Sequence, residues 1–130
     1  IADVGQDKYE EVSIAKKGDN LGWKTKEAMH CFEAESCDAT GLVEPIFEYD
    51  HSLGASITGG YVVQDGSVFD GQYIFGDFTT GRIWALDWHK TEPAQEILMS
   101  GLNISTFGRN AAGQVFVGDF GKGVIYRLGF

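Results

Sequence analysis

Basic residues and long apolar stretches are both scarce in this 130-residue chain. Lys and Arg together number 10 against 19 Asp and Glu, which gives a formal net charge of −9. Nucleic acids and anionic membrane surfaces are bound by clustered Lys and Arg, so this balance predicts no nucleic-acid partner. No apolar run approaches the ~20 residues that a membrane-spanning helix needs, so we also predict no membrane span.

Helical signals are weak as well. The best helical window, about residues 24–35, is short and has no sustained apolar stripe. The chain has 2 prolines but 18 glycines, a glycine share about twice the usual ~7%, together with 3 Trp, 5 Tyr and 9 Phe. Many glycines between aromatic and β-branched runs are typical of tight turns joining short strands. We therefore predict an all-β fold with a single domain.

An internal repeat indicates the architecture. Residues 71–86 align without gaps on residues 113–128, a shift of 42 positions, with eight identities in sixteen. A period of 42 matches one four-stranded propeller blade, which takes ~40–45 residues. Solenoids of helical hairpins share this length, but they need amphipathic helices. The repeat therefore predicts β-propeller blades.

Each copy of the repeat predicts a hairpin whose turn contains Asp and Gly. We expect the carboxylates of Asp77 and Asp119 to accept hydrogen bonds from turn amides. Gly81 and Gly123 are expected to supply the positive φ angle that such a turn requires.

A third, more diverged copy opens the chain, with a turn at residues 2–5 and an exit strand at residues 10–14. Its spacing to the next copy exceeds one period, and the excess falls within residues 23–42. We interpret that segment as an inserted loop on one face. The chain thus predicts about three blades, with approximate boundaries at residues 1–41, 42–86 and 87–130.

Three blades do not close a ring, because propellers typically have 4–8 blades. The remaining blades are expected either from the same longer chain, of which this would be the C-terminal part, or from a second copy.

The two cysteines, Cys31 and Cys37, flank a five-residue acidic segment within the insertion. Their spacing fits neither a redox Cys-x-x-Cys motif nor a zinc pattern. We predict a small loop disulfide, which places the protein in a secreted or periplasmic location. The alternative is a pair of free thiols in a cytosolic loop.

Five stretches of the chain, residues 1–12, 17–23, 45–47, 56–62 and 73–78, are informative together with Cys31 and Cys37. They resemble the glucose/sorbosone dehydrogenase family. The similarity is greatest to the branch that contains the hedgehog-interacting-protein-like propellers. The resemblance implies a six-bladed propeller, and in the dehydrogenases it implies pyrroloquinoline quinone (PQQ) held with calcium and used to oxidise a sugar at its anomeric carbon.

The resemblance also implies site residues. No position of this chain matches the family's catalytic histidine, so it implies no catalytic residue within residues 1–130. Gly5 and Gln6 fall where family members offer backbone carbonyls to the cofactor's calcium ion. Glu11 and the carbonyl of Leu21 match a second, structural calcium site, and such oxygens are suitable calcium ligands.

The chain departs from the family where the cofactor's carboxylates are bound. Dehydrogenases use Lys and Arg there, because these side chains pair with carboxylates directly. This chain has Thr79 at the Lys position and Asn103 and Ser105 near the Arg positions. None of the three is cationic, and Arg82 and Arg109 are the nearby candidates to replace the missing charge.

Two functions follow from this interpretation. The first is the C-terminal portion of a PQQ-dependent aldose dehydrogenase-like propeller with a sugar substrate. The alternative is a non-enzymatic secreted propeller that binds a protein or glycan partner, and a third reading is a propeller in which calcium only stabilises the fold. His51 either lies on the binding face or is a turn histidine bonded to Asp50.

Overall fold

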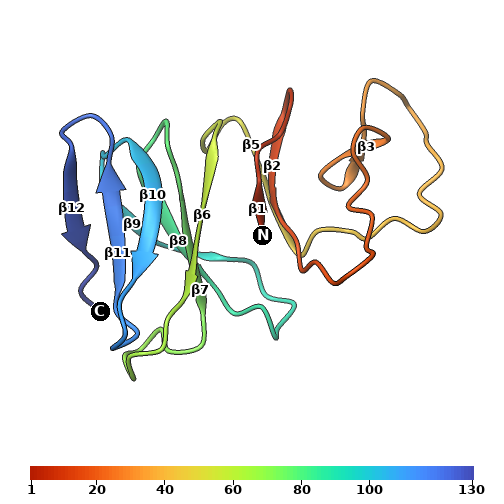
Figure 1. The fold of residues 1–130 in the computed structure, drawn as a ribbon. Coiled ribbons are helices and arrows are strands. Elements are labelled where there is room, and N and C mark those ends of the chain that lie inside the picture. Colours follow the sequence, from red (N-terminus) through yellow and green to blue (C-terminus); the bar gives the residue numbers. More distant parts are fainter.

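The computed structural model describes residues 1–130 as strands, turns and loops without any helix. The strands form four sheets, and every pairing within them is antiparallel. Three sheets stand side by side as blades, and the fourth is a small hairpin set to one side (Figure 1). The predicted all-β class with about three blades is confirmed as a partial propeller. No segment forms a helix that could cross a membrane.

The middle and last blades contain the two copies of the repeat. The copies form the hairpins β7–β8 (residues 73–77 and 82–86) and β11–β12 (residues 115–119 and 124–127). They pair in the same register, since Gly76 faces Ile83 and Gly118 faces Ile125. The middle blade is a four-stranded sheet of β6 (Ile57–Val62), β7 (Tyr73–Asp77), β8 (Arg82–Leu86) and β9 (Gln95–Met99). The last blade has three strands, β10 (Ile104–Arg109), β11 (Val115–Asp119) and β12 (Val124–Arg127).

The first blade contains β1 (Ala2–Asp3), β2 (Tyr9–Val12) and β5 (Phe47–Asp50), in that order. Asp3 ends β1 as Asp77 ends β7, so β1 and β2 correspond to the second and third strands of a blade and β5 to the fourth. The diverged third copy is therefore confirmed, although β2 begins and ends earlier than the predicted residues 10–14.

The predicted blade boundaries do not coincide with the sheets. The three sheets span residues 2–50, 57–99 and 104–127, so the predicted ranges 1–41, 42–86 and 87–130 separate β5 and β9 from the strands that they pair with. The repeated hairpin reveals the period of a blade but not where each blade ends, because the two fourth strands do not resemble each other in sequence.

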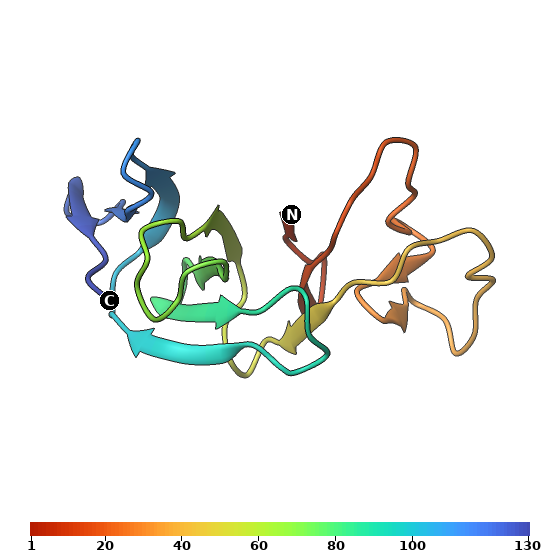
Figure 2. The ribbon, with the colours of Figure 1, turned by 90° about the horizontal axis from the view of Figure 1, so that it is seen from below.

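The insertion lies between β2 and β5 and projects away from the last blade (Figures 1 and 2). It contains the short hairpin of β3 (Lys26–Glu27) and β4 (His30–Cys31). A parallel bridge between Asn20 and Leu42 joins its two ends. Residues 24–35, the best helical window of the sequence, thus form a hairpin and turns instead of a helix. This agrees with the absence of a sustained apolar stripe in that segment.

Apolar side chains fill both spaces between the three blades. Ile74 and Ile83 face the last blade, whereas their neighbours Phe75 and Trp84 face the first. Successive residues of a strand point to opposite faces, so a sheet covered on both sides is apolar at consecutive positions. Full burial of one such side chain contributes about 1.5–3 kcal/mol.

The turns of the repeated hairpins have the predicted chemistry. Asp77 Oδ1 accepts the backbone N–H groups of Thr79 and Thr80 at 2.9 Å each, and Asp119 Oδ1 accepts the N–H of Gly121 at 3.0 Å. The φ angles at positions 81 and 123, both glycine, are 74° and 66°. The expected roles of both aspartates and both glycines are therefore confirmed.

Candidate functional site

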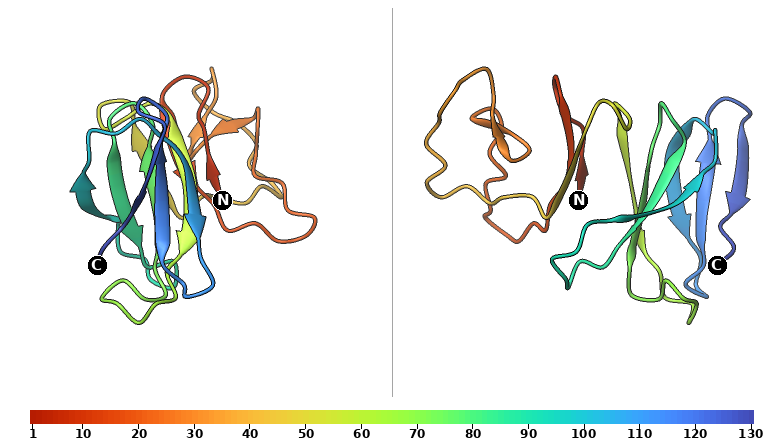
Figure 3. Two further views of the ribbon diagram at one scale, coloured as in Figure 1. Left: turned by 60° about the vertical axis from the view of Figure 1, so that its left-hand side comes forward. Right: turned by 180° about the vertical axis from the view of Figure 1, so that it is seen from behind.

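Four turns lie together at one end of the blades, the upper edge in Figure 1, and we call this end the loop edge. The view from behind shows the same grouping (Figure 3, right). The turns are β1–β2 (residues 4–8), β5–β6 (51–56), β7–β8 (78–81) and β11–β12 (120–123). Gly5 and Gln6 lie in the first of these turns and Thr79 in the third, while Asn103 directly precedes β10 and Ser105 is its second residue. The fold thus brings the five predicted cofactor positions toward one edge.

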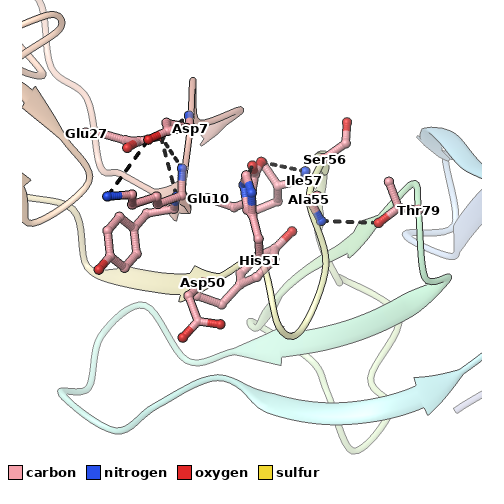
Figure 4. Close-up of polar contacts among 12 residues, drawn as sticks. Asp7, Glu10, Glu27, Asp50, His51, Ala55, Ser56, Ile57 and Thr79 are labelled. Carbon is pink, nitrogen blue, oxygen red and sulfur yellow. Dashed lines mark hydrogen bonds and ion pairs between the residues drawn. The ribbon is translucent and has the colours of Figure 1, made fainter. Parts of the chain in front are cut away.

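The three uncharged side chains at the predicted cofactor positions are already hydrogen-bonded within the chain. Thr79 Oγ1 donates to Asp77 Oδ1 at 2.6 Å and accepts the N–H of Ala55 at 3.2 Å (Figure 4). Asn103 Nδ2 donates to a backbone carbonyl of the neighbouring turn at 3.3 Å. Ser105 Oγ donates to a carbonyl of β11 at 3.4 Å. Thr79 and Asn103 thus stabilise turns, Ser105 bonds to strand β11, and none of the three adds a positive charge.

The two arginines do not replace the missing charge. Arg82 Nη1 pairs with Glu96 on the adjacent strand β9. Arg109 Nη1 donates to the carbonyl of Val62 at 3.0 Å and to Gln64 Oε1 at 2.7 Å, at the end of the blades opposite the loop edge. The positions that the resemblance assigns to quinone binding therefore do not fit the quinone's carboxylates within residues 1–130.

Glu11, the predicted ligand of a structural calcium ion, lies in β2 with one oxygen unpartnered. Its Oε2 is buried and makes no hydrogen bond. Burial, followed by the charges of four neighbouring carboxylates, raises the pKa of Glu11 to about 7. These neighbours are Asp3, Glu10, Glu27 and Glu48. A hard cation would satisfy this oxygen and offset the repulsion.

The predicted carbonyl ligands are free as well. The carbonyl oxygens of Gly5, Gln6 and Leu21 accept no hydrogen bond from the rest of the chain. No group of three or more His, Cys, Asp or Glu side chains has the geometry of a metal site. A calcium ion at Glu11 would therefore need carbonyl or water oxygens to complete its shell of 6–8 ligands. The oxygen donors present, one carboxylate and free carbonyls, are therefore of the kind that calcium prefers.

The β1–β2 turn is held by Glu27, which the sequence analysis did not identify. Glu27 Oε1 accepts the backbone N–H groups of Asp7, Lys8 and Tyr9 at 2.5, 2.9 and 3.5 Å (Figure 4). The side chain is buried. Burial alone would raise the pKa of Glu27, but these backbone donors outweigh it and hold the pKa below its ordinary value.

His51 is paired with a buried carboxylate rather than with its neighbour. Its Nε2 lies 3.0 Å from Glu10 Oε1, and Glu10 Oε2 accepts the N–H of Ile57 at 2.8 Å. Asp50 instead accepts the N–H of Ser52, so the predicted Asp50–His51 pair is wrong. Because Glu10 is in the first blade and Ile57 begins the middle one, this carboxylate links two blades.

Asp77 makes a second link between the same blades. Its Oδ2 accepts the hydroxyl of Tyr49, on β5, at 2.9 Å and the N–H of Ser56 at 2.8 Å. Burial raises the pKa of Tyr49, with the Asp77 charge as the next cause. Burial also opposes ionisation of Asp77, but its hydrogen bonds, foremost from Thr79, lower its pKa below the ordinary value.

Two proteins of Arabidopsis thaliana are similar to this chain. HIPL1 protein is 35% identical and HIPL2 protein 37% identical, each over an alignment of 99 residues that covers 65% of this chain. The similarity supports the hedgehog-interacting-protein-like branch. The chain spans 14% of the length of either relative. No family model matches the chain, and no solved structure matches it.

The predicted disulfide between Cys31 and Cys37 is confirmed, with the two Cα atoms 5.7 Å apart. A disulfide persists in oxidising compartments. Both this bond and the similarity to the hedgehog-interacting-protein-like branch are compatible with a secreted protein.

Proposed function

We propose that residues 1–130 are part of a secreted, non-enzymatic propeller that holds calcium at Glu11 and binds a protein or glycan partner at the loop edge. This corresponds to the hedgehog-interacting-protein-like alternative of the sequence analysis. The similarity to the two HIPL proteins supports it.

The observation that carries the proposal is the chemistry of three positions. Where a quinone would need cations, the chain has Thr79, Asn103 and Ser105, and each side chain already makes a hydrogen bond within the chain. A carboxylate-bearing cofactor gains little from neutral side chains that already have partners. The loop edge is thus better suited to a partner that does not need this charge.

An exposed aromatic residue at the loop edge, Phe120, supports partner binding. The repeat places Phe78 and Phe120 at equivalent positions of neighbouring turns, with ring centroids 6.1 Å apart. Phe120 is 73% exposed. Aromatic side chains give large contact area at low entropic cost, and they serve as anchors in protein interfaces and as stacking surfaces for other ring systems.

Arrays of secreted proteins and of glycans probed with the purified protein would test partner binding. We expect Phe120→Ala to abolish binding to whichever ligand the wild type selects. Val68→Ala is a matched control, because Val68 is 80% exposed in the β6–β7 loop at the opposite end. Equal loss in both variants would contradict a partner at the loop edge.

Calorimetric titration of the metal-free protein would test the calcium ion. The free Oε2 of Glu11 leads us to expect calcium binding that raises the melting temperature, because a ligand that binds only the folded state stabilises it. Glu11→Gln should weaken binding. Calcium affinity unchanged in this variant would contradict a site at Glu11.

The second candidate is the PQQ-dependent sugar dehydrogenase. The free carbonyls of Gly5 and Gln6 at the loop edge favour it. When bound, the quinone would supply the hydride acceptor, and the base would have to come from outside residues 1–130. Reconstitution of the full-length protein with PQQ and calcium, followed by dye reduction with aldoses, separates the two candidates. Retained quinone and aldose oxidation would overturn the non-enzymatic proposal.

A further inference from the structure

The β1–β2 turn is supported differently from its counterparts in the other blades. In the β7–β8 and β11–β12 turns, the aspartate that ends the preceding strand accepts the turn amides two or three residues ahead. Asp3 occupies this position in the first blade, but it accepts no turn amide. The amides are instead bound by Glu27, which lies 18–20 residues further along the chain.

Three successive N–H groups converging on one oxygen form an anion-binding nest. Glu27 occupies this nest and is only 5% exposed, so water does not replace it. The turn is closely wound around the carboxylate. A Cβ atom at Gly5 would lie 1.6 Å from the carbonyl oxygen of Tyr9 and 3.0 Å from Glu27 Oε1. With its amides drawn toward Glu27, the turn leaves the carbonyls of Gly5 and Gln6 without partners.

The hairpin that carries Glu27 is itself fixed in place. Within it, Lys26 pairs with Cys31 and Glu27 with His30, and Cys31 is bonded to Cys37. The ring of His30 stacks on Tyr9 with centroids 3.8 Å apart.

Glu48 of β5 holds the same hairpin from the blade side. It accepts the N–H of Met29 and pairs with His30 Nε2, both at 2.9 Å. The insertion is therefore docked on the first blade at the residues flanking Glu27.

We propose that Glu27 is a positioning residue: its carboxylate fixes the β1–β2 turn so that the carbonyls of Gly5 and Gln6 are presented to a calcium ion, and the Cys31–Cys37 disulfide keeps Glu27 in place. The part of this proposal that concerns calcium rests on the proposed function. It adds calcium binding at the loop-edge carbonyls of Gly5 and Gln6 to the site proposed at Glu11. The inserted hairpin then acts as a support, held by one disulfide, that maintains cation affinity at the loop edge.

Hydrogen-exchange mass spectrometry on peptides covering residues 6–9 of the metal-free protein tests whether Glu27 fixes the β1–β2 turn. Glu27→Ala should accelerate exchange of these amides at least about tenfold, since each loses a charge-assisted hydrogen bond. Glu27→Gln, which keeps the shape and an acceptor oxygen, should give a smaller increase and serves if the alanine variant does not fold. Glu44→Gln is the control, because Glu44 is in the insertion but pairs with Lys26 instead of the turn.

Calcium titration of the same variants tests whether Glu27 and the disulfide affect calcium binding. We expect Glu27→Ala to weaken calcium binding about tenfold, and Glu44→Gln to leave it unchanged. The Cys31→Ser/Cys37→Ser pair should weaken binding in the wild type but add nothing in the Glu27→Ala background, because both changes act through the same carboxylate.

Unchanged exchange at residues 6–9 in a folded Glu27→Ala protein would overturn the positioning role. An equal loss of calcium affinity in the Glu44→Gln protein would overturn the specific link between Glu27 and the cation. Failure of the wild type to bind calcium would instead overturn the calcium part of the proposed function, while the exchange data would still decide whether Glu27 holds the turn.

Discussion

The β7–β8 and β1–β2 turns occupy equivalent places in neighbouring blades but are stabilised in opposite ways. Asp77 stabilises its own turn through residues two and three positions ahead. The β1–β2 turn depends on Glu27, which reaches it from an insertion on the far side of β2. A turn whose amides are bound by its own aspartate does not depend on the insertion, whereas a turn whose amides are bound from the insertion can be controlled by it.

The largest effect is expected from removal of Asp77. Asp77→Ala leaves the buried Tyr49 hydroxyl and the Ser56 amide without an acceptor, and we expect a loss of about 3 kcal/mol in the free energy of unfolding. Asp119→Ala is the matched change in the last blade and removes two amide contacts, with an expected loss of about 1–2 kcal/mol. Denaturant unfolding measures both, and equal losses would contradict an inter-blade role for Asp77.

The next effect concerns the disulfide. Replacement of Cys31 and Cys37 by Ser should lower stability by about 2 kcal/mol, as expected for a short closed loop. Hydrogen exchange should accelerate in residues 6–9 and stay unchanged in residues 78–81. Acceleration in both turns, or in neither, would mean that the two turns do not differ in their dependence on the insertion.

A smaller effect is expected from Tyr49→Phe. The variant keeps the ring, which stacks near Trp84, and removes only the hydroxyl that donates to Asp77. We expect a loss of about 1 kcal/mol, measured by thermal or denaturant unfolding. In the Asp77→Ala background the same change should cost much less, because its acceptor is already gone. Full additivity of the two changes would show that the hydroxyl and the carboxylate do not interact.

The smallest effect is expected in how the free energy of unfolding depends on pH under acidic conditions. The folded-state pKa of Asp77 is below its ordinary value, so its contribution to stability is complete above that ordinary value, about 3.9, and is lost as the pH falls through the folded-state pKa. Asp77→Asn should therefore show a flatter loss of stability below about pH 4 than the wild type. Parallel profiles of the two proteins would exclude Asp77 as a source of acid sensitivity.

Local features of this fold were predictable from the sequence because they repeat or lie close together. The repeat predicted both hairpins, the roles of Asp77 and Asp119 depend on residues two or three positions ahead, and Cys31 had a single possible partner. Each of these features is encoded within a few residues.

The remaining features depend on contacts between distant segments. Nothing around Glu27 indicates that it binds amides 18–20 residues earlier, and Glu10 meets Ile57 across 47 positions. The pairing of β9 with β8 was missed because the fourth strands share no motif.

Anomalous diffraction from a calcium-soaked crystal tests the proposed cation most directly. The orphaned Oε2 of Glu11, among four other carboxylates, predicts a peak about 2.3–2.6 Å from that oxygen. A second peak beside the carbonyls of Gly5 and Gln6 would extend the same account to the loop edge. Well-ordered Glu11 with no peak beside it at saturating calcium would contradict the account.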